Sequence, residues 1–363
     1  MKPIDIRVRA GQTRSSYPIL IAHGLIDSLG AHLDTVAKGA RVLVVSSPKV
    51  WKLHGARISK ALPDSRHLLV ADGERAKHLR TVSRVYDGLL AAKADRRTVV
   101  VVVGGGVLGD LAGFAAASFL RGLPLVHVPT TVVAQVDSAI GGKVGVNHAL
   151  GKNLIGAFYP PRAVLSDPGV LATLSAREFR AGLYEVIKYG VIESPRLFAR
   201  LEADLPKILA RDIGTLVPVI AECSKIKARV VMADEHETGE RRILNFGHTA
   251  GHALEAITNY RRFRHGEAVG VGMLAAAQLA NARGALSDEA RQRVFALIER
   301  LGALPAVNDL SAVECAAATG RDKKVISGTL HFVLPVKIGK TEIVTDVTPA
   351  ELMKALRAIG LRK

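Results

Sequence analysis

Two histidines and a glutamate in the segment NFGHTAGHALE have types and spacing that could do chemistry. His252 follows His248 by four residues and Glu255 follows by three more, so a helix would carry all three on one face. Such a face can bind a metal ion, form an ion pair or fill a satisfied core. The spacing alone does not choose among these interpretations.

Two further segments offer metal ligands of the same types. Glu185 and Lys188 stand three residues apart in YEVIKYG, and His265 opens an apolar stretch rich in small residues, HGEAVGVG. Glu185, His248 and His265 would supply one oxygen and two nitrogens to Zn²⁺ and leave room for a substrate oxygen. An exposed helical ion pair would also explain Glu185 with Lys188, and spacing alone favours His248 with His252 as ligands. No HExxH motif or cysteine pair narrows the choice.

A glycine-rich turn in VVVGGGVLGDLAGF offers a different chemistry. Its glycines at 104, 106 and 109 match G-x-G-x-x-G directly after an apolar run and at the start of a helical pattern. Missing side chains let backbone N–H groups and a helix N-terminus approach a pyrophosphate. This context favours phosphate binding over a turn used only for packing, although the turn follows a later strand and lacks a clear acidic partner for a ribose.

Polar residues follow other expected strands in the same half: Thr130, Thr131, Asp137, Lys143, Lys152 and Asn153. Ligands in open α/β sheets bind at the carboxyl ends of strands, so these side chains should converge there. For any single lysine, a solvated surface role is the alternative.

The elements that must position these groups differ between two halves of the chain. Four apolar runs predict strands buried on both faces of a parallel sheet: ARVLVVSS (40–47), RHLLVADG (66–73), TVVVVVGGG (98–106) and LPLVHVPTT (123–131). Later segments such as TLVPVIAECSKIKARVVMADE and HGEAVGVGMLAAAQLANARG have helical periodicity. We predict an α/β domain at 1–170 and a mainly α-helical domain at 171–363, with extended structure near the end and a turn at Gly339 and Lys340.

The composition bounds the class of protein. The 363 residues are 48% hydrophobic and 23% charged, as in a folded globular chain. A net charge of +17 suggests nucleic acid or anionic membrane, but aromatics are 4% and the basic residues are scattered, so we expect neither partner. Cys223 and Cys315 lack CxxC spacing, and the sequence shows no signal peptide or run of 18 apolar residues. We therefore expect a cytoplasmic protein.

Taken together and in order, nine motifs resemble those of 3-dehydroquinate synthases: DGERAK, GGGVLGD, PTT, QVDSAIGGKVGVN, GKNLIGAFYPP, YEVIKYG, ADEHETGERRILNFGHTAGHALE, HGEAVGVGM and RDKKVISG. The resemblance covers residues 40–345. It implies a Rossmann-like NAD-binding domain with a parallel sheet, a helical metal- and substrate-binding domain, an active site between them and a homodimer.

The resemblance also implies a reaction. Members of the family are lyases of the shikimate pathway that convert 3-deoxy-arabino-heptulosonate 7-phosphate, a small anionic keto-sugar acid phosphate, into 3-dehydroquinate and phosphate. Transient oxidation with bound NAD precedes phosphate elimination, re-reduction and an intramolecular aldol reaction. The expected metal is Zn²⁺, with Co²⁺ as an alternative. Another sugar-phosphate cyclase of the superfamily and a metal-dependent polyol dehydrogenase are the alternative functions.

By the same resemblance, the metal ligands are Glu185, His248 and His265, His252 faces the substrate, and Glu255 has no assigned role. NAD would be held by Asp72, Glu74, Lys77, Gly105, Gly106, Val107, Gly109, Asp110, Thr130, Thr131, Lys143, Lys152, Leu171 and Thr173. Substrate and catalytic contacts would come from Asp137, Lys143, Lys152, Asn153, Lys188, Lys227, Arg241, Asn245, His252 and either Lys323 or Lys324, with Arg121 supplied across the dimer interface. Ser46 or Ser47 stands where some relatives carry an acidic or amide residue for the ribose.

Overall fold

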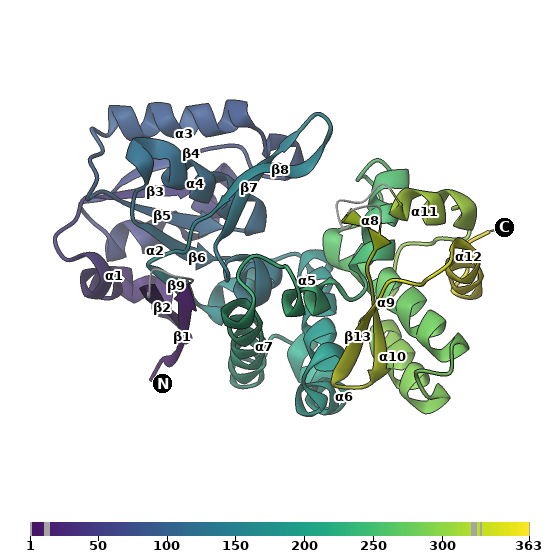
Figure 1. The fold of residues 1–363 in the computed structure, drawn as a ribbon. Helices are drawn as coiled ribbons and strands as arrows, with labels where there is room; N and C mark the ends of the chain where they lie inside the picture. Colours follow the sequence, from purple (N-terminus) through teal and green to yellow (C-terminus); the bar gives the residue numbers. More distant parts are fainter. Residues whose placement is uncertain (1, 11–14, 321–324, 327–328, 363) are drawn as a thin grey trace. The chain divides into compact units, whose positions relative to one another are not determined.

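The computed structural model describes residues 2–10, 15–320, 325–326 and 329–362. The chain divides into two compact units (Figure 1). The first comprises Met1–Leu174 and Ile213–Glu235, and the second comprises Ser175–Asp212 and His236–Lys363. The binding roles expected for 1–170 and 171–363 stay predictions. The contacts add that Ile213–Glu235, although late in the chain, packs with the first unit.

The first unit is built on a sheet whose described strands have the order β1-β2-β9-β6-β5-β3-β4. These strands are β1 (Ile4–Ala10), β2 (Ser15–Ile21), β3 (Val42–Ser46), β4 (Arg66–Leu69), β5 (Val99–Gly104), β6 (Leu125–Pro129) and β9 (Ala163–Ser166). β1 pairs antiparallel with β2, and the other neighbours pair parallel. The helices of this unit are α1 (Leu29–Ala37), α2 (Pro48–Ala61), α3 (Leu79–Ala91), α4 (Gly106–Ser118) and α7 (Ile213–Ala233). A separate antiparallel hairpin joins β7 (Lys143–His148) to β8 (Gly151–Phe158).

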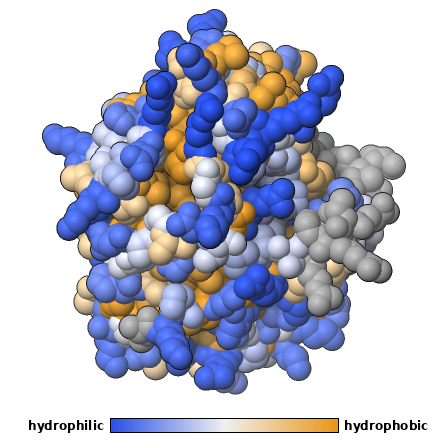
Figure 2. Space-filling model, turned by 90° about the vertical axis from the view of Figure 1, so that its left-hand side faces the viewer, coloured by the Kyte–Doolittle hydropathy of each residue, from blue (hydrophilic) through white to orange (hydrophobic). Residues whose placement is uncertain are grey.

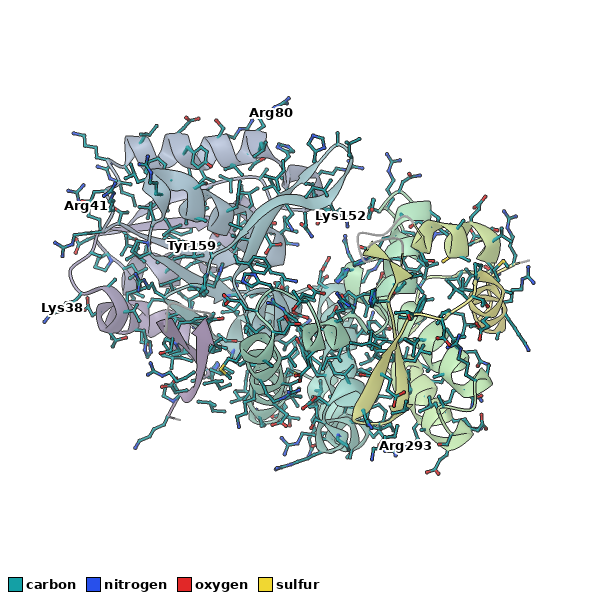
Figure 3. All side chains as sticks on the ribbon, viewed as in Figure 1. Lys38, Arg41, Arg80, Lys152, Tyr159 and Arg293 are labelled. Carbon is teal, nitrogen blue, oxygen red and sulfur yellow. The ribbon has the colours of Figure 1, made fainter. Side chains whose placement is uncertain are left out.

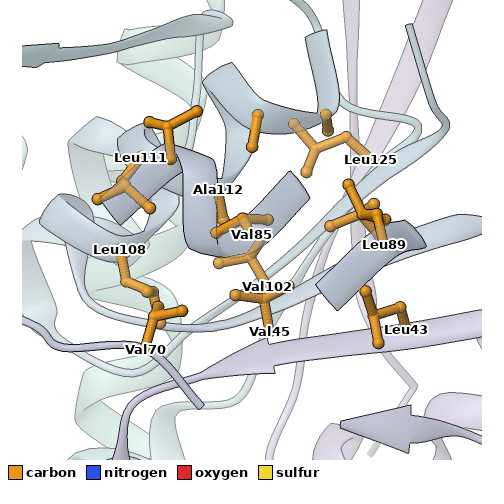
Figure 4. Packing of buried hydrophobic residues seen from close by; sticks show 14 of the residues in the cluster. Leu43, Val45, Val70, Val85, Leu89, Val102, Leu108, Leu111, Ala112 and Leu125 are labelled. Atoms are coloured by element: carbon orange, nitrogen blue, oxygen red, sulfur yellow. The ribbon is translucent and has the colours of Figure 1, made fainter. Parts of the chain in front are cut away.

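β5 shows how a run of valines becomes a strand buried on both faces. Val100 and Val102 pack into a core with α3 and α4, whereas Val101 and Val103 belong to the core on the opposite face with α1 and α2. Figure 4 shows the first core, where Val102 lies among residues such as Leu108. Burial of one such side chain contributes about 1.5–3 kcal/mol. The sheet therefore needs helices on both faces, as the apolar runs predict.

The four expected strands all form, but one differs in burial. The segments at 40–47, 98–106 and 123–131 contain β3, β5 and β6, which are buried along most or all of their length. The prediction that the run at 66–73 is buried on both faces is wrong, because β4 has mostly exposed side chains. β4 is the last strand in the sheet order, so it has a neighbour on one side only.

The order of strands also places the glycine turn. The chain passes from β3 outward to β4 and then returns to β5 on the other side of β3. Ligands of open α/β sheets bind outside the carboxyl ends of the strands at such a reversal. The turn after β5 therefore lies at the usual binding position, although β5 is not the first strand of the sequence.

The second unit is mainly helical, as predicted. Its elements are α5 (Ala176–Ile192), α6 (Pro195–Leu209), the 3-10 helix η6 (Glu240–Asn245), α8 (His248–Ile257), α9 (His265–Ala282), α10 (Asp288–Arg300), α11 (Ala312–Thr319) and α12 (Pro349–Ala358), with short strands β10 (Val325–Ile326) and β11 (Thr329–Leu330). The expected extended pair is the hairpin of β12 (Phe332–Lys337) and β13 (Lys340–Val344). Gly339, which lies between the two strands, has a φ of 88°.

The surface does not concentrate hydrophilic groups in one place on the face that Figure 2 shows. Hydrophilic side chains spread over that face, with hydrophobic patches between them. None of the helices in the described part of the chain is long and apolar enough to cross a membrane.

Candidate metal centre and nucleotide site

Three side chains of the second unit converge on one point. Glu185 comes from α5, and His248 and His265 are the first residues of α8 and α9. The Nε2 atoms of the two histidines lie 3.5 Å and 3.4 Å from the same carboxylate oxygen, Oε1 of Glu185. One carboxylate and two imidazole nitrogens, all within 4.8 Å of one another, can hold a divalent cation such as Zn²⁺.

The other ring nitrogen of His248 supports this arrangement. Nδ1 lies 3.1 Å from the backbone carbonyl oxygen of Phe246. A proton on Nδ1 would be donated to that carbonyl, which leaves the Nε2 lone pair directed toward Glu185.

Glycines let the three helices approach closely enough for Glu185, His248 and His265 to meet. Gly266 directly follows the histidine of α9, and a Cβ there would overlap the carbonyl oxygen of Ala181, one turn before the glutamate of α5. Gly272 of α9 lies in the same way against the carbonyl oxygen of Gly247, which directly precedes the histidine of α8. The small residues that follow His265 in the sequence therefore set the spacing of Glu185, His248 and His265.

A carboxylate in the first turn of α9 fixes the start of that helix. Glu267 accepts a hydrogen bond from the backbone N–H of Arg264 at 2.8 Å. It also accepts two bonds from the Arg177 guanidinium of α5, at 2.7 Å and 2.8 Å. The two-point contact holds the beginning of α9 against α5.

Lys188 forms part of the centre. Its Nζ lies 2.6 Å from Oε2 of Glu185, and both side chains are 1% exposed. The alternative of an exposed helical ion pair is therefore wrong. A buried charge is costly without a partner, and the Lys188 ammonium compensates one oxygen of Glu185 while the other oxygen faces the histidines.

Two carboxylates act on His265. Glu185 faces its Nε2, and Oε2 of Glu255 lies 3.5 Å from its Nδ1. Desolvation lowers the pKa of His265, but the contacts with the two carboxylates outweigh it and raise this pKa to about 10. The centre therefore attracts positive charge.

The prediction that one helix carries His248, His252 and Glu255 is confirmed by α8. His248, His252 and Glu255 lie on one helix, and the His252 ring is 5.5 Å from that of His248 and 5.9 Å from that of His265. His252, Glu255 and His265 form a second group within ligand distance of one another. Geometry alone therefore leaves two candidate ligand sets that share His265.

Other residues expected to bind substrate precede α8. Arg241 in η6 is 2% exposed, and Asn245 donates from Nδ2 to Oε1 of Glu237 at 2.6 Å. Lys323 and Lys324 lie outside the described residues.

The glycine turn of the first unit has the expected form. β5 ends at Gly104, and Gly105 is the N-cap of α4. A Cβ on Gly105 would lie 3.1 Å from Cγ2 of Thr131, and one on Gly106 would lie 2.6 Å from Oγ of Ser138. The missing side chains let Thr131 and Ser138 pack close to this turn, at a helix N-terminus of the kind that binds phosphates.

A pocket adjoins this turn, lined by the three consecutive glycines, His127, Ala134 and Ser138 among others. Burial lowers the pKa of His127 to about 4, so its imidazole is neutral at neutral pH. The buried Oγ of Ser138 has no hydrogen-bond partner in the described structure. A bound ligand with a polar atom would satisfy this hydroxyl.

Further expected cofactor residues lie around the turn. Thr130 donates its backbone N–H to the carbonyl of Gly104 at 2.9 Å, and Gly109 donates to that of Gly105 at 3.0 Å. Val107 is half-buried in the first turn of α4.

Lys77 joins two residues that the resemblance assigns to different ligands. Its Nζ lies 2.5 Å from Oδ2 of Asp110 and 2.5 Å from Oδ1 of Asn153. Burial raises the pKa of Asp110, and the nearby ammonium of Lys77 opposes this rise. The three side chains thus form one polar cluster beside α4.

Asn147 of β7 connects Asn153 of this cluster to Glu74, and Figure 3 labels Lys152 on the same β7–β8 hairpin. The Nδ2 of Asn147 donates to Oε1 of Glu74 at 2.7 Å, and Lys152 Nζ lies 3.8 Å from the same oxygen. The Oδ1 of Asn147 accepts a hydrogen bond from the backbone N–H of Asn153 at 2.9 Å.

Asp137 forms an ion pair with Lys227 of α7, and the Lys227 side chain is 9% exposed. α7 therefore supplies one of the predicted residues to the first unit. Lys143 is the first residue of β7 and is exposed.

The remaining predicted residues are more dispersed. Leu171 is fully buried, so its backbone is the part that could reach a ligand. Thr173 Oγ1 lies 3.1 Å from Nε2 of His54. Asp72 is exposed and accepts from the backbone N–H of Gly73 at 2.7 Å. Arg121 is exposed at the end of a short 3-10 helix, Phe119–Arg121, and has a φ of 66°.

The two serines considered for ribose recognition already have local partners. Ser46 donates its hydroxyl to the carbonyl of Val103 at 2.9 Å, and the Ser47 hydroxyl accepts from the backbone N–H of Val50 at 3.3 Å. Ser46 thus joins β3 to β5, Ser47 caps α2, and neither offers a negative charge.

Sequence reasoning missed several residues of these sites: Asn147, Glu237, His127 and Ser138. Asn147 and Ser138 lie inside quoted motifs, in which the sequence analysis selects neighbouring charged residues as site residues. Glu237 is one of several acidic residues in ADEHETGERR, and His127 sits within an apolar strand. Only the three-dimensional contacts distinguish them.

Solved structures with the same fold include cyclases that were crystallised with NAD⁺ and a divalent metal. ValA, the 2-epi-5-epi-valiolone synthase of Streptomyces hygroscopicus subsp. jinggangensis 5008, solved with NAD⁺ and Zn²⁺ bound, is 31% identical with a TM-score of 0.88, covering 96% of this chain and 98% of that one. A 2-deoxy-scyllo-inosose synthase complexed with carbaglucose-6-phosphate, NAD⁺ and Co²⁺ is 25% identical with a TM-score of 0.84, covering 98% and 100%.

The family follows from the sequence comparisons. Models of the N-terminal and C-terminal parts of 3-dehydroquinate synthase match residues 67–181 and 182–325. The 3-dehydroquinate synthase of Koribacter versatilis (strain Ellin345) is 44% identical over 358 residues, covering 97% of this chain and 98% of that protein. The chain belongs to the 3-dehydroquinate synthase family, whose members are phosphate-eliminating cyclases.

Proposed function

We propose that this chain converts 3-deoxy-arabino-heptulosonate 7-phosphate into 3-dehydroquinate and phosphate, with NAD and Zn²⁺ as cofactors. The observation that carries the proposal is the convergence of Glu185, His248 and His265 in a chain similar to 3-dehydroquinate synthases over nearly its whole length. When bound, NAD⁺ would accept and return a hydride, and the metal would polarise the alcohol and carbonyl oxygens of the substrate.

The donor set fits the metal. Both Nε2 atoms face one carboxylate oxygen, and Nδ1 of His248 has a backbone acceptor in Phe246. Three protein ligands leave a position for a substrate oxygen, as in catalytic zinc sites. We assign Glu185, His248 and His265 as the ligands. Lys188 would hold the second oxygen of Glu185 and present its ammonium to the substrate.

The glycine turn fits NAD. The cradle at Gly105 and Gly106 is one that a Cβ would fill, and the Ser138 hydroxyl beside it is buried with no partner among the described residues. We propose that the N-terminus of α4 binds the pyrophosphate and that Ser138 donates a hydrogen bond to the cofactor. The other predicted cofactor contacts are Asp72, Glu74, Lys77, Val107, Gly109, Asp110, Thr130, Thr131, Lys143, Lys152, Leu171 and Thr173.

The substrate carries a carboxylate and a phosphate, which cationic side chains recognise. We assign this role to Lys143, Lys152, Lys188, Lys227 and Arg241. Asp137, Asn153, Asn245 and His252 would orient the hydroxyl and carbonyl groups. Fixed positions make the final ring closure an oriented intramolecular step.

We further propose a cytoplasmic homodimer in which Arg121 of one subunit completes the site of the other. A positive φ at Arg121 costs energy for a residue with a side chain, and such strain clusters at functional positions. Mixing inactive Arg121→Ala subunits with inactive Glu185→Gln subunits should restore part of the activity. Sedimentation that shows a monomer, or no recovery in mixed dimers, would contradict this assignment.

The main experiment follows phosphate release from the heptulosonate phosphate by zinc-loaded protein with a trace of NAD⁺, together with NADH absorbance. Many turnovers without accumulated NADH are expected. Glu185→Gln should lower the rate by about a thousandfold or more, because a bound metal lowers the barrier by several kcal/mol. Glu202→Gln is the matched control, since Glu202 pairs with Arg293 outside the metal centre.

Each other result points elsewhere. Stoichiometric NADH would indicate a polyol dehydrogenase. No phosphate from the heptulosonate, with release from a sugar phosphate that lacks a carboxylate, would indicate another cyclase of the superfamily.

A further inference from the structure

Glu255 carries none of the roles proposed above, yet its carboxylate lies at the metal centre. It stands on the face of α8 that also carries His248 and His252. Its Oε2 is 3.5 Å from Nδ1 of His265, while Nε2 of the same ring is 3.4 Å from Glu185. The His265 ring thus lies between two carboxylates from different helices.

A histidine that binds metal through Nε2 carries a proton on Nδ1, and the group that accepts this proton fixes the ring orientation. For His248 that acceptor is the carbonyl of Phe246. His265 is the first residue of its helix and is 40% exposed, so its ring has fewer neighbours to hold it. Glu255, which is 5% exposed, is the acceptor on its Nδ1 side.

We infer that Glu255 is a positioning residue of the metal centre, whose carboxylate accepts the Nδ1–H of His265 and holds Nε2 toward Glu185. The inference rests on the proposed ligand set of Glu185, His248 and His265. It explains why NFGHTAGHALE carries a glutamate after its two histidines. The competing assignment makes Glu255 a direct ligand together with His252 and His265.

The first test measures zinc affinity of the full-length protein by competition with a chromophoric chelator. Glu255→Ala should weaken zinc binding by about 10–100-fold, the usual effect of losing such a partner. Glu255→Gln should have a smaller effect, because the amide oxygen still accepts a hydrogen bond. Glu202→Gln, which removes an ion-paired glutamate of the same unit, should leave the affinity unchanged. If Glu255→Ala does not fold, Glu255→Gln carries the test.

A second readout responds to ring orientation and not to stability. In the Co²⁺-loaded protein, proton NMR should show two strongly shifted exchangeable signals from the Nδ1–H groups of His248 and His265. Glu255→Ala should broaden or remove the His265 signal by faster exchange with water. The His248 signal should persist, because the Phe246 carbonyl is untouched.

The outcomes separate this inference from the proposed function. If Glu185→Gln abolishes zinc binding while both Glu255 variants match Glu202→Gln, the positioning role is wrong and the ligand set stands. If Glu185→Gln leaves zinc affinity intact, the ligand set itself is wrong. Loss of binding in His252→Ala as large as in Glu255→Ala, or more than one ion per chain, would make Glu255 a direct ligand and overturn its positioning role.

Discussion

The glycine turn of the first unit and the metal centre of the second are built in opposite ways. The turn consists of backbone at the end of β5, and Gly105 and Gly106 act through the side chains they lack. The metal centre consists of side chains from three helices, with Glu185 and Lys188 buried as an ion pair. One site is local and nearly uncharged, and the other is assembled from distant residues and depends on charge.

This difference predicts how each site fails. A backbone cradle fails when a side chain fills it, and the rest of the sheet remains folded. A cluster of buried charges fails when helices separate or when one partner is removed, because the remaining charge is left without compensation. Perturbations of the two sites should therefore differ in size and in pH dependence.

Among the variants that change packing or surface charge, the largest effect is expected from Gly266→Ala. The added Cβ overlaps the carbonyl oxygen of Ala181, so α9 must move away from α5 and carry His265 from Glu185. Zinc affinity should fall by more than about 100-fold, and unfolding should cost about 1–3 kcal/mol less, as for other overpacked cores. Chelator competition and urea denaturation measure both quantities.

Gly320→Ala is the control for this variant, because its new Cβ would meet its nearest neighbour, the carbonyl oxygen of Ala317, at an ordinary 3.6 Å. Undiminished zinc affinity in Gly266→Ala would show that the packing of α9 on α5 does not set the ligand geometry.

A smaller and more selective effect is expected from Gly106→Val. Its side chain would fill the cradle beside Ser138, and the affinity for NAD⁺ should fall about tenfold or more, as a phosphate loses its approach to the helix N-terminus. Zinc affinity should not change. Isothermal titration with NAD⁺ and then Zn²⁺ tests both expectations, and a parallel loss of zinc affinity would contradict the independence of the two sites.

The same contrast explains what the sequence could predict. The glycine turn, the valine strand before it and the helix after it are contiguous, so a local pattern was enough. Spacing could place His248 and His252 on one face, but it could not select Glu185 and His265, which lie in other helices. The motif resemblance implies that set, which stays a proposed set of ligands. Burial of β4 was mispredicted because an edge position depends on the order of all the strands.

Neither local patterns nor the motif resemblance identifies some residues of the two sites. Asn147 and Ser138 are uncharged and common types, and their importance follows from what they contact. Glu255 was visible from the start as part of the face with the two histidines. Its contact with His265 joins α8 to α9, and spacing within one helix does not predict a contact between two helices.

The metal centre should respond to pH, unlike the glycine turn. The pKa of His265 is raised to about 10, so the metal-free ring is protonated at neutral pH and zinc must displace a proton. Zinc affinity should therefore rise about tenfold per pH unit between about pH 6 and 8 from this group. Calorimetry in buffers of different ionisation enthalpy should detect the released proton. A flat profile would show that His265 is neutral before zinc binds.

The smallest effect tests whether charge alone, without burial, makes a carboxylate critical. In the same unit, Glu351 forms two contacts with Arg283 at 2.8 Å and 2.9 Å but remains 36% exposed. Hydrogen bonds from Arg283 and Thr348 lower the pKa of Glu351 to about 2 from its ordinary 4.5. A lowered pKa stabilises the fold above the ordinary value, and this contribution disappears as the pH falls through the folded-state pKa.

Glu351→Gln should lower the free energy of unfolding by less than about 1 kcal/mol at neutral pH, because water screens the pair. The difference between variant and parent should shrink between about pH 4.5 and 2 in urea titrations. Zinc affinity should remain that of the parent chain, since a partly exposed pair away from the candidate metal centre can lose one charge without leaving its partner fully buried.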